Sequence, residues 1–133
     1  MNWTKFFVAF IAAFVFIFLF GFLWYGKLME GAHNEVPQLW RSQPDFPWLI
    51  FGHIVMAFFL TFLYARFAGP GGAGAGATLG ALIAFFSIGN DLITFAVQPL
   101  TMKILGGWAV GDLLMLTIAG AIVGAINKPR AIG

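Results

Sequence analysis

Four long apolar stretches constrain this chain more than any other feature. They cover about residues 6–25, 48–66, 77–98 and 108–126, and each is close to the roughly 20 residues that a helix needs to cross a bilayer. Only 9% of residues are charged and 61% are hydrophobic, whereas soluble domains carry roughly 25% charge. The sequence therefore predicts an all-α integral membrane protein, residues 1–133 forming a single bundle of four transmembrane helices.

The composition also excludes several classes of function. The chain has no cysteine, which rules out thiol nucleophiles, disulfides and thiolate metal sites. Its basic balance rests on a few scattered charges that form no stripe, so we expect no nucleic-acid binding. The apolar start is longer than the core of a signal peptide and lacks a small-residue exit, so we interpret it as a retained first span.

The loop over residues 27–47 is the longest connection, and the ends of the spans carry charges and aromatic side chains. One side of the membrane, with both termini, has four basic residues, and the other has three: Lys5, Arg66, Lys128 and Arg130 against Lys27, Arg41 and Lys103. This excess predicts cytoplasmic termini by the positive-inside rule. Aromatic residues at span ends are expected to be interfacial anchors, here Trp24, Tyr25, Trp40, Trp48 and Trp108.

Three ionisable side chains lie inside the predicted spans: His53, Asp91 and Asp112. With a rise of 1.5 Å per residue, they lie roughly 6, 4 and 7 Å from the span centres, all displaced toward the long loop. A carboxylate there costs on the order of 2.5–3.5 kcal/mol, so it must pair, line a wet cavity or stay protonated. We expect one intramembrane polar cluster, supported by Asn90, acting either as a functional site or as hydrogen-bonded helix packing.

Small and polar residues form a stripe along one face of the third span. Its members are Ala77, Gly80, Ala84, Ser87, Asp91, Thr94 and Gln98. Because such faces let helices approach closely, we expect the second, third and fourth spans to pack around this stripe, with the Phe-rich first span more peripheral. Glycines four residues apart predict further close contacts, at 72–76–80, 107–111 and 120–124, the last facing a neighbour within this chain or in another subunit.

His53 is also a candidate cofactor ligand. One histidine can bind a haem or a chlorophyll-type pigment axially, and a Phe-rich neighbourhood suits a large apolar ring. Together with two aspartates it is a candidate ligand for a divalent cation. We favour a hydrogen bond from His53 to an aspartate or a helix carbonyl, and we predict no dedicated metal site.

The stretch over residues 20–28, with Leu23-Trp24-Tyr25-Gly26-Lys27 at its centre, resembles the N-terminal signature of a family of small bacterial membrane proteins, domain-of-unknown-function family 1761. A fourth span that opens with tryptophan and an acidic residue, here residues 108–112, is also similar. Lys27 stands where that family often has proline. The resemblance implies four spans and a bacterial cytoplasmic (inner) membrane, and it brings no known activity or site residues.

For function we expect a non-enzymatic accessory or scaffolding subunit of a larger membrane complex, photosynthetic or respiratory. Its partners are then lipids and other membrane subunits, or further copies of itself. The alternative is a small proton- or cation-coupled transporter, working as a dimer, with Asp91 and Asp112 as coupling carboxylates and His53 as proton partner. The sequence shows no nucleophile, metal set or substrate-binding loop that predicts an enzyme.

Overall fold

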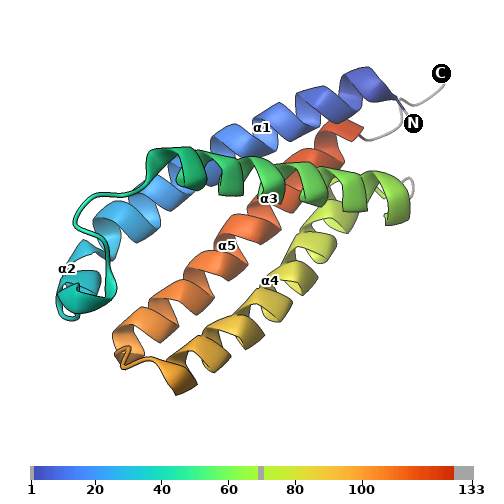
Figure 1. Cartoon of the computed structure of the whole chain (residues 1–133). Helices are drawn as coiled ribbons and strands as arrows, with labels where there is room; N and C mark the ends of the chain where they lie inside the picture. Colours follow the sequence, from blue (N-terminus) through green and yellow to red (C-terminus); the bar gives the residue numbers. More distant parts are fainter. Residues whose placement is uncertain (1, 69–70, 128–133) are drawn as a thin grey trace.

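The computed structural model describes residues 2–68 and 71–127, and every regular element in these ranges is a helix (Figure 1). Four helical stretches are long and apolar enough to cross a membrane, which confirms the predicted all-α bundle. They are α1 (Trp3–Gly21) with its continuation η1 (Phe22–Leu28), α3 (Phe46–Phe67), α4 (Gly72–Val97) and α5 (Met102–Asn127). Two short helices, α2 (Glu30–Asn34) and η2 (Pro37–Leu39), occupy the long connection.

Helix α5 lies at the centre of the bundle, which corrects the prediction that the third span would hold this place. Its buried side chains include Leu116, Ala119 and Val123, all packed into one core with residues of α1 and α3. An adjacent edge of α5 faces α4 through glycines. Helix α5 therefore uses one face to pack against α4 and another to pack against α1 and α3.

Helices α4 and α5 approach each other along glycines. A Cβ atom on Gly76 would overlap the carbonyl oxygen of Gly120, and a Cβ on Gly80 would overlap that of Leu116. Gly124 faces Gly72 in the same way. The glycine spacings therefore predicted this seam correctly, and the neighbour of the Gly120–Gly124 edge is α4 of the same chain.

Helix α1 is not peripheral, contrary to the prediction. Four of its residues at spacings of three and four are almost fully buried, namely Phe6, Ala9, Ala13 and Ile17. They pack against α3, where Ala57 and Leu60 are buried, and against α5. The phenylalanines around α1 concealed this stripe in the sequence, because an all-round apolar helix shows no preferred face.

All four spanning stretches are longer than the predicted spans. Helix α4 begins at Gly72 rather than near residue 77, since the glycine run packs on α5. Gly72 has φ 74°, a conformation that favours glycine, and its N–H donates to the Tyr64 hydroxyl at 2.9 Å. Helix α5 begins at Met102 rather than near residue 108, and η1 prolongs the first span beyond Tyr25 to Leu28.

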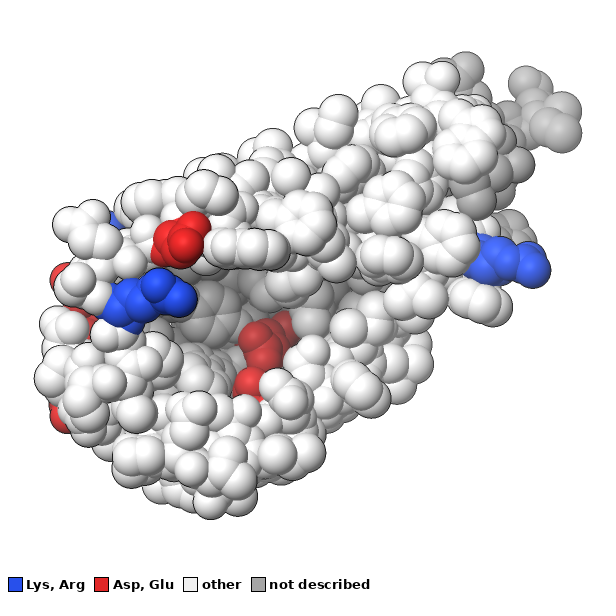
Figure 2. All heavy atoms as spheres, viewed as in Figure 1, with Lys and Arg blue, Asp and Glu red and all other residues white. Residues whose placement is uncertain are grey.

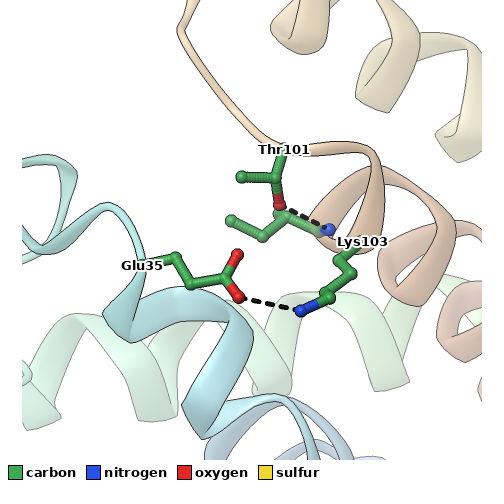
Figure 3. Close-up of polar contacts among 4 residues, drawn as sticks. Glu35, Thr101 and Lys103 are labelled. Carbon is green, nitrogen blue, oxygen red and sulfur yellow. Dashed lines mark hydrogen bonds and ion pairs between the residues drawn. The ribbon is translucent and has the colours of Figure 1, made fainter.

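Two side chains stabilise the start of α5, in a segment that the sequence predicted to be a link between spans. The hydroxyl of Thr101 accepts the N–H of Ile104 at 3.3 Å, as a helix N-cap does, and Lys103 forms an ion pair with Glu35 at 2.8 Å (Figure 3). Both charged side chains are largely exposed. The pair therefore joins the long connection to α5 at the surface of the molecule.

The start of α1 and the end of α5 lie at the same end of the bundle (Figure 1). This agrees with an even number of spans. Two of the basic residues used to predict cytoplasmic termini, Lys128 and Arg130, lie outside the described residues. The side of the membrane on which this end lies stays a prediction.

Candidate functional site

Asp91 on α4 and Asp112 on α5 are brought together by the register of the glycine seam. With Gly76 opposite Gly120, the antiparallel register places Asp112 opposite Ala84, and Asp91 lies further along α4. Helical side chains lean toward the N-terminus of their own helix. In an antiparallel pair these two leans point toward each other, and the carboxyl groups of Asp91 and Asp112 lie next to each other.

Tyr25 is the third member of this site. Its hydroxyl donates a hydrogen bond to Oδ1 of Asp112 at 2.5 Å, joining η1 to α5. The other oxygen of the neighbouring carboxyl, Asp91 Oδ2, is buried and has no hydrogen-bond partner within residues 2–68 and 71–127. We call Tyr25, Asp91 and Asp112 the acidic site. One of its acceptor atoms is therefore unsatisfied within the described chain.

The π-helical segment η1 sets the position of Tyr25. The indole N–H of Trp24 donates to the carbonyl of Gly107 at 2.9 Å, so two consecutive aromatic residues both contact α5. A π-helix has more residues per turn than an α-helix, so consecutive side chains are separated by a smaller rotation. Such segments occur often at functional sites. Gly111 makes room for them, because a Cβ there would overlap the Trp24 ring and lie 2.9 Å from the Tyr25 hydroxyl.

The acidic site is open on one side. Helices α3 and α4 diverge from their connection, and Figure 2 shows a hollow between them with acidic side chains on its floor. Basic and acidic side chains stand at the rim, over the segment that leads into α3. The hollow provides a route from the surface of the protein to the carboxyl groups.

The first half of α3 forms one wall of this hollow and has little cover from the rest of the chain. Trp48 is 71% exposed and Phe51 is 55% exposed, whereas Tyr64 near the other end is 2% exposed. A shallow apolar recess on this half is lined by Pro47, Trp48 and Phe51. This part of α3 offers its apolar side chains to lipid or to another membrane component.

The connection between η1 and α3 folds over the loop end of α5. His33 in α2 accepts a hydrogen bond from the indole N–H of Trp108 at 3.1 Å, and its carbonyl accepts one from Trp40 at 2.8 Å. Met29 lies against Gly107, where a Cβ would overlap its side chain. We call residues 30–39, with α2 and η2, the cap.

His53 lies on the side of α3 that faces α1, and it does not join the polar cluster predicted from the sequence. Its Nδ1 is 2.7 Å from the carbonyl of Leu49, and its ring meets that of Phe18 edge-on with centroids 5.2 Å apart. Nε2 faces Gly21, at 3.2 Å from where a Cβ would stand. Of the partners considered for His53, the helix carbonyl is the one that it contacts.

The stripe of α4 divides into two parts. Gly80 and Ala84 are buried in the seam with α5, as predicted, and Ser87 is half-buried. The hydroxyl of Thr94 donates to the carbonyl of Asn90 within the same helix at 3.0 Å. Asn90 and Gln98 are exposed, so neither forms part of the acidic site.

Four of the five residues expected to be interfacial anchors donate hydrogen bonds within the chain. These are Trp24, Tyr25, Trp40 and Trp108. Trp48 alone of the five is largely exposed, and its role as an anchor stays a prediction. Neither Tyr25 nor His33 was identified from the sequence as a hydrogen-bond partner of residues in α5.

Among the described residues, no three His, Asp or Glu side chains are grouped closely enough to bind a metal ion. His53, Asp91 and Asp112 therefore do not form the cation site considered from sequence.

No protein-family model, no curated protein and no solved structure matches this chain.

Proposed function

We propose that this protein is a small transport protein that binds a proton or a cation at the acidic site and couples it to the movement of a solute. The observation that carries the proposal is the proximity of the carboxyl groups of Asp91 and Asp112, which come from two different helices. Figure 2 shows acidic side chains on the floor of a hollow of the bundle. Ionised carboxylates only accept hydrogen bonds and repel each other. Their contact therefore requires a proton or a cation between them.

The three members of the acidic site differ in the hydrogen bonds that they make. Tyr25 donates to Asp112 and so fixes the orientation of that carboxyl. Asp91 retains a buried oxygen without a partner among the described residues. Asp91 is thus the group that takes up and releases the proton or cation, and Asp112 is its positioned neighbour. Ionisable residues inside membrane spans commonly mark such proton and ion pathways.

The proposal is tested by reconstituting the full chain into liposomes that enclose a pH-sensitive dye. After a proton gradient is imposed, Na⁺, K⁺ and the amphipathic cation tetraphenylphosphonium are added in turn. We expect at least one of them to drive proton movement faster than in empty liposomes, and Asp91→Asn to abolish it.

The matched control is Asp45→Asn, because Asp45 is an exposed carboxyl before α3 whose side chain makes no capping bond. This variant should transport as the wild type does. Equal flux in wild-type, Asp91→Asn and empty liposomes for every solute would contradict the proposal.

A second candidate is an accessory subunit of a larger membrane complex, favoured by the exposure of Trp48 and Phe51 on α3. Such a surface suits a neighbouring membrane helix as well as lipid. Gentle extraction of the tagged protein, followed by mass spectrometry and an absorption spectrum of the intact particle, tests it. A defined large complex supports this role, and a bare monomer or dimer argues against it.

The setting in a bacterial cytoplasmic membrane is proposed on the resemblance to family 1761. Its two stretches contact each other in this fold, since Trp24 bonds to Gly107 and Tyr25 to Asp112. A shared contact gives a physical reason for the two stretches to occur together.

A further inference from the structure

The cap is fastened to the bundle through one histidine. Nε2 of His33 accepts the N–H of Trp108 on α5 at 3.1 Å, and the ring also hydrogen-bonds the backbone of Tyr25 in η1. An indole nitrogen can only donate a hydrogen bond, so Nε2 must be without a proton. The proton of the neutral ring is then on Nδ1. His33 therefore joins three helical elements only in its neutral form.

We propose that His33 is a proton-sensitive latch, which holds the cap against α5 while it is neutral and releases Trp108 when Nε2 is protonated. Protonation would place two N–H donors face to face at a separation that only a donor and an acceptor can share. Histidine is the side chain whose ordinary titration range lies near physiological pH. The latch thus responds to the pH on the loop side of the membrane.

The surroundings of His33 favour the neutral ring. The ring meets Trp40 edge-on with centroids 4.9 Å apart, and burial lowers the pKa of His33 below 6.5, while the bond to the Tyr25 backbone opposes this shift. The charged side chains on the elements around it are Glu30, Glu35, Lys27, Lys103 and Asp112, and burial outweighs any influence of theirs. Glu35 and Lys103 are moreover paired with each other.

The latch is connected to the acidic site at both of its contacts. Trp108 lies about one helical turn before Asp112, and Tyr25 binds His33 through its backbone and Asp112 through its hydroxyl. Release of the cap therefore loosens the segment that holds the phenol on the carboxyl. This consequence for transport rests on the proposed function, whereas the latch itself does not.

The experiment uses a single spin label on the cap of the full chain in lipid nanodiscs. The chain has no cysteine, and Gly31 in α2 has open space around a Cβ, so Gly31→Cys provides a unique label site that disturbs no contact. We expect the label to become more mobile as the pH falls, with a midpoint below pH 6.5. A label at Gly106, which also has open space in α5, should show no such transition.

Two matched variants identify the group that titrates. Glutamine in His33→Gln keeps an acceptor for Trp108 and a donor for Tyr25 but does not titrate, so the transition should vanish while the cap stays immobile. His53→Gln changes the other histidine of the chain and should leave the transition intact. Trp108→Phe removes the donor and should raise both the mobility at neutral pH and the midpoint.

A transition that persists in His33→Gln, one that is lost in His53→Gln, or a label with constant mobility at every pH would overturn the latch. These outcomes do not depend on solute flux. If the label shows the transition but no coupled transport is found, the latch is supported and the proposed function is contradicted. If coupled transport is found but the label shows no transition, the proposed function is supported and the latch is contradicted.

Discussion

The hydroxyl of Tyr25 bonds to the carboxyl of Asp112, 87 positions away in the sequence. This contact crosses from the end of the first span to the middle of the last one. It depends on the π-helical segment that turns Trp24 and Tyr25 together toward α5. The acidic site is therefore built by three spans, although its two carboxyl groups come from only two of them.

Tyr25→Phe should weaken solute-coupled proton movement without unfolding the protein. Loss of a hydrogen bond to a carboxyl group costs on the order of 1 kcal/mol, which corresponds to about a fivefold loss in solute affinity. Flux titrations in proteoliposomes measure it. Tyr64→Phe, at the only other tyrosine, should reduce thermal stability and leave the solute affinity unchanged, because its hydroxyl bonds Gly72 instead. Equal affinities in Tyr25→Phe and wild type would contradict this role.

Gly111→Ala should disturb the acidic site from a distance. The added methyl group overlaps the Trp24 ring and crowds the Tyr25 hydroxyl, so the phenol moves away from Asp112. The flux phenotype should resemble that of Tyr25→Phe. Gly106→Ala is the matched control on the same helix, since a Cβ there meets no atom within 4 Å. If both variants transport alike, Gly111 does not set the position of Tyr25.

The α4–α5 seam should be sensitive to a single methyl group. Gly76→Ala pushes a Cβ into the carbonyl of Gly120, and overpacking of this kind costs typically about 1–3 kcal/mol. Gly74→Ala, two residues away with open space, should be neutral or stabilising by up to about 1 kcal/mol because alanine favours helix. Reversible unfolding in mixed detergent micelles measures both free energies. The reverse order of stability would refute the seam.

The free energy of unfolding should fall as the medium is acidified. His33 titrates near 6.5 in the unfolded chain and at a lower pH in the folded one. Between these two values the unfolded state binds more protons, so stability declines as the pH falls through 6.5 toward the folded pKa, and it does not change through His33 above that window. Detergent unfolding measured at several pH values checks this, and His33→Gln should remove the decline.

The sequence predicted the number of spans and the glycine seam well, because both follow from local patterns. Apolar length identifies a span, and glycines such as Gly76 and Gly120 at intervals of four mark a close helix contact. The central position of α5 was not predictable in this way. It depends on which face of each helix packs against its neighbours. The buried stripe of α1 could not be recognised among the surrounding phenylalanines.

The acidic site was predicted in part. Equal depth in the membrane suggested that Asp91 and Asp112 would meet, and the register of the seam explains why they do. Depth carries no information on the direction in which a helix faces, so His53 was assigned to the site although it faces α1. Tyr25 was expected to be an interfacial anchor and not a member of the site, because a π-helix, which no local pattern here signals, changes the face on which it lies.

The most direct test of the acidic site is infrared spectroscopy of the full chain in lipid, in a buffer depleted of metal cations. Under these conditions a proton must occupy the contact between Asp91 and Asp112. We predict a carbonyl band of a protonated carboxyl group in the wild type, lost in both Asp91→Asn and Asp112→Asn and kept in Asp45→Asn. A wild type without this band, or a band that persists in both site variants, would contradict the account.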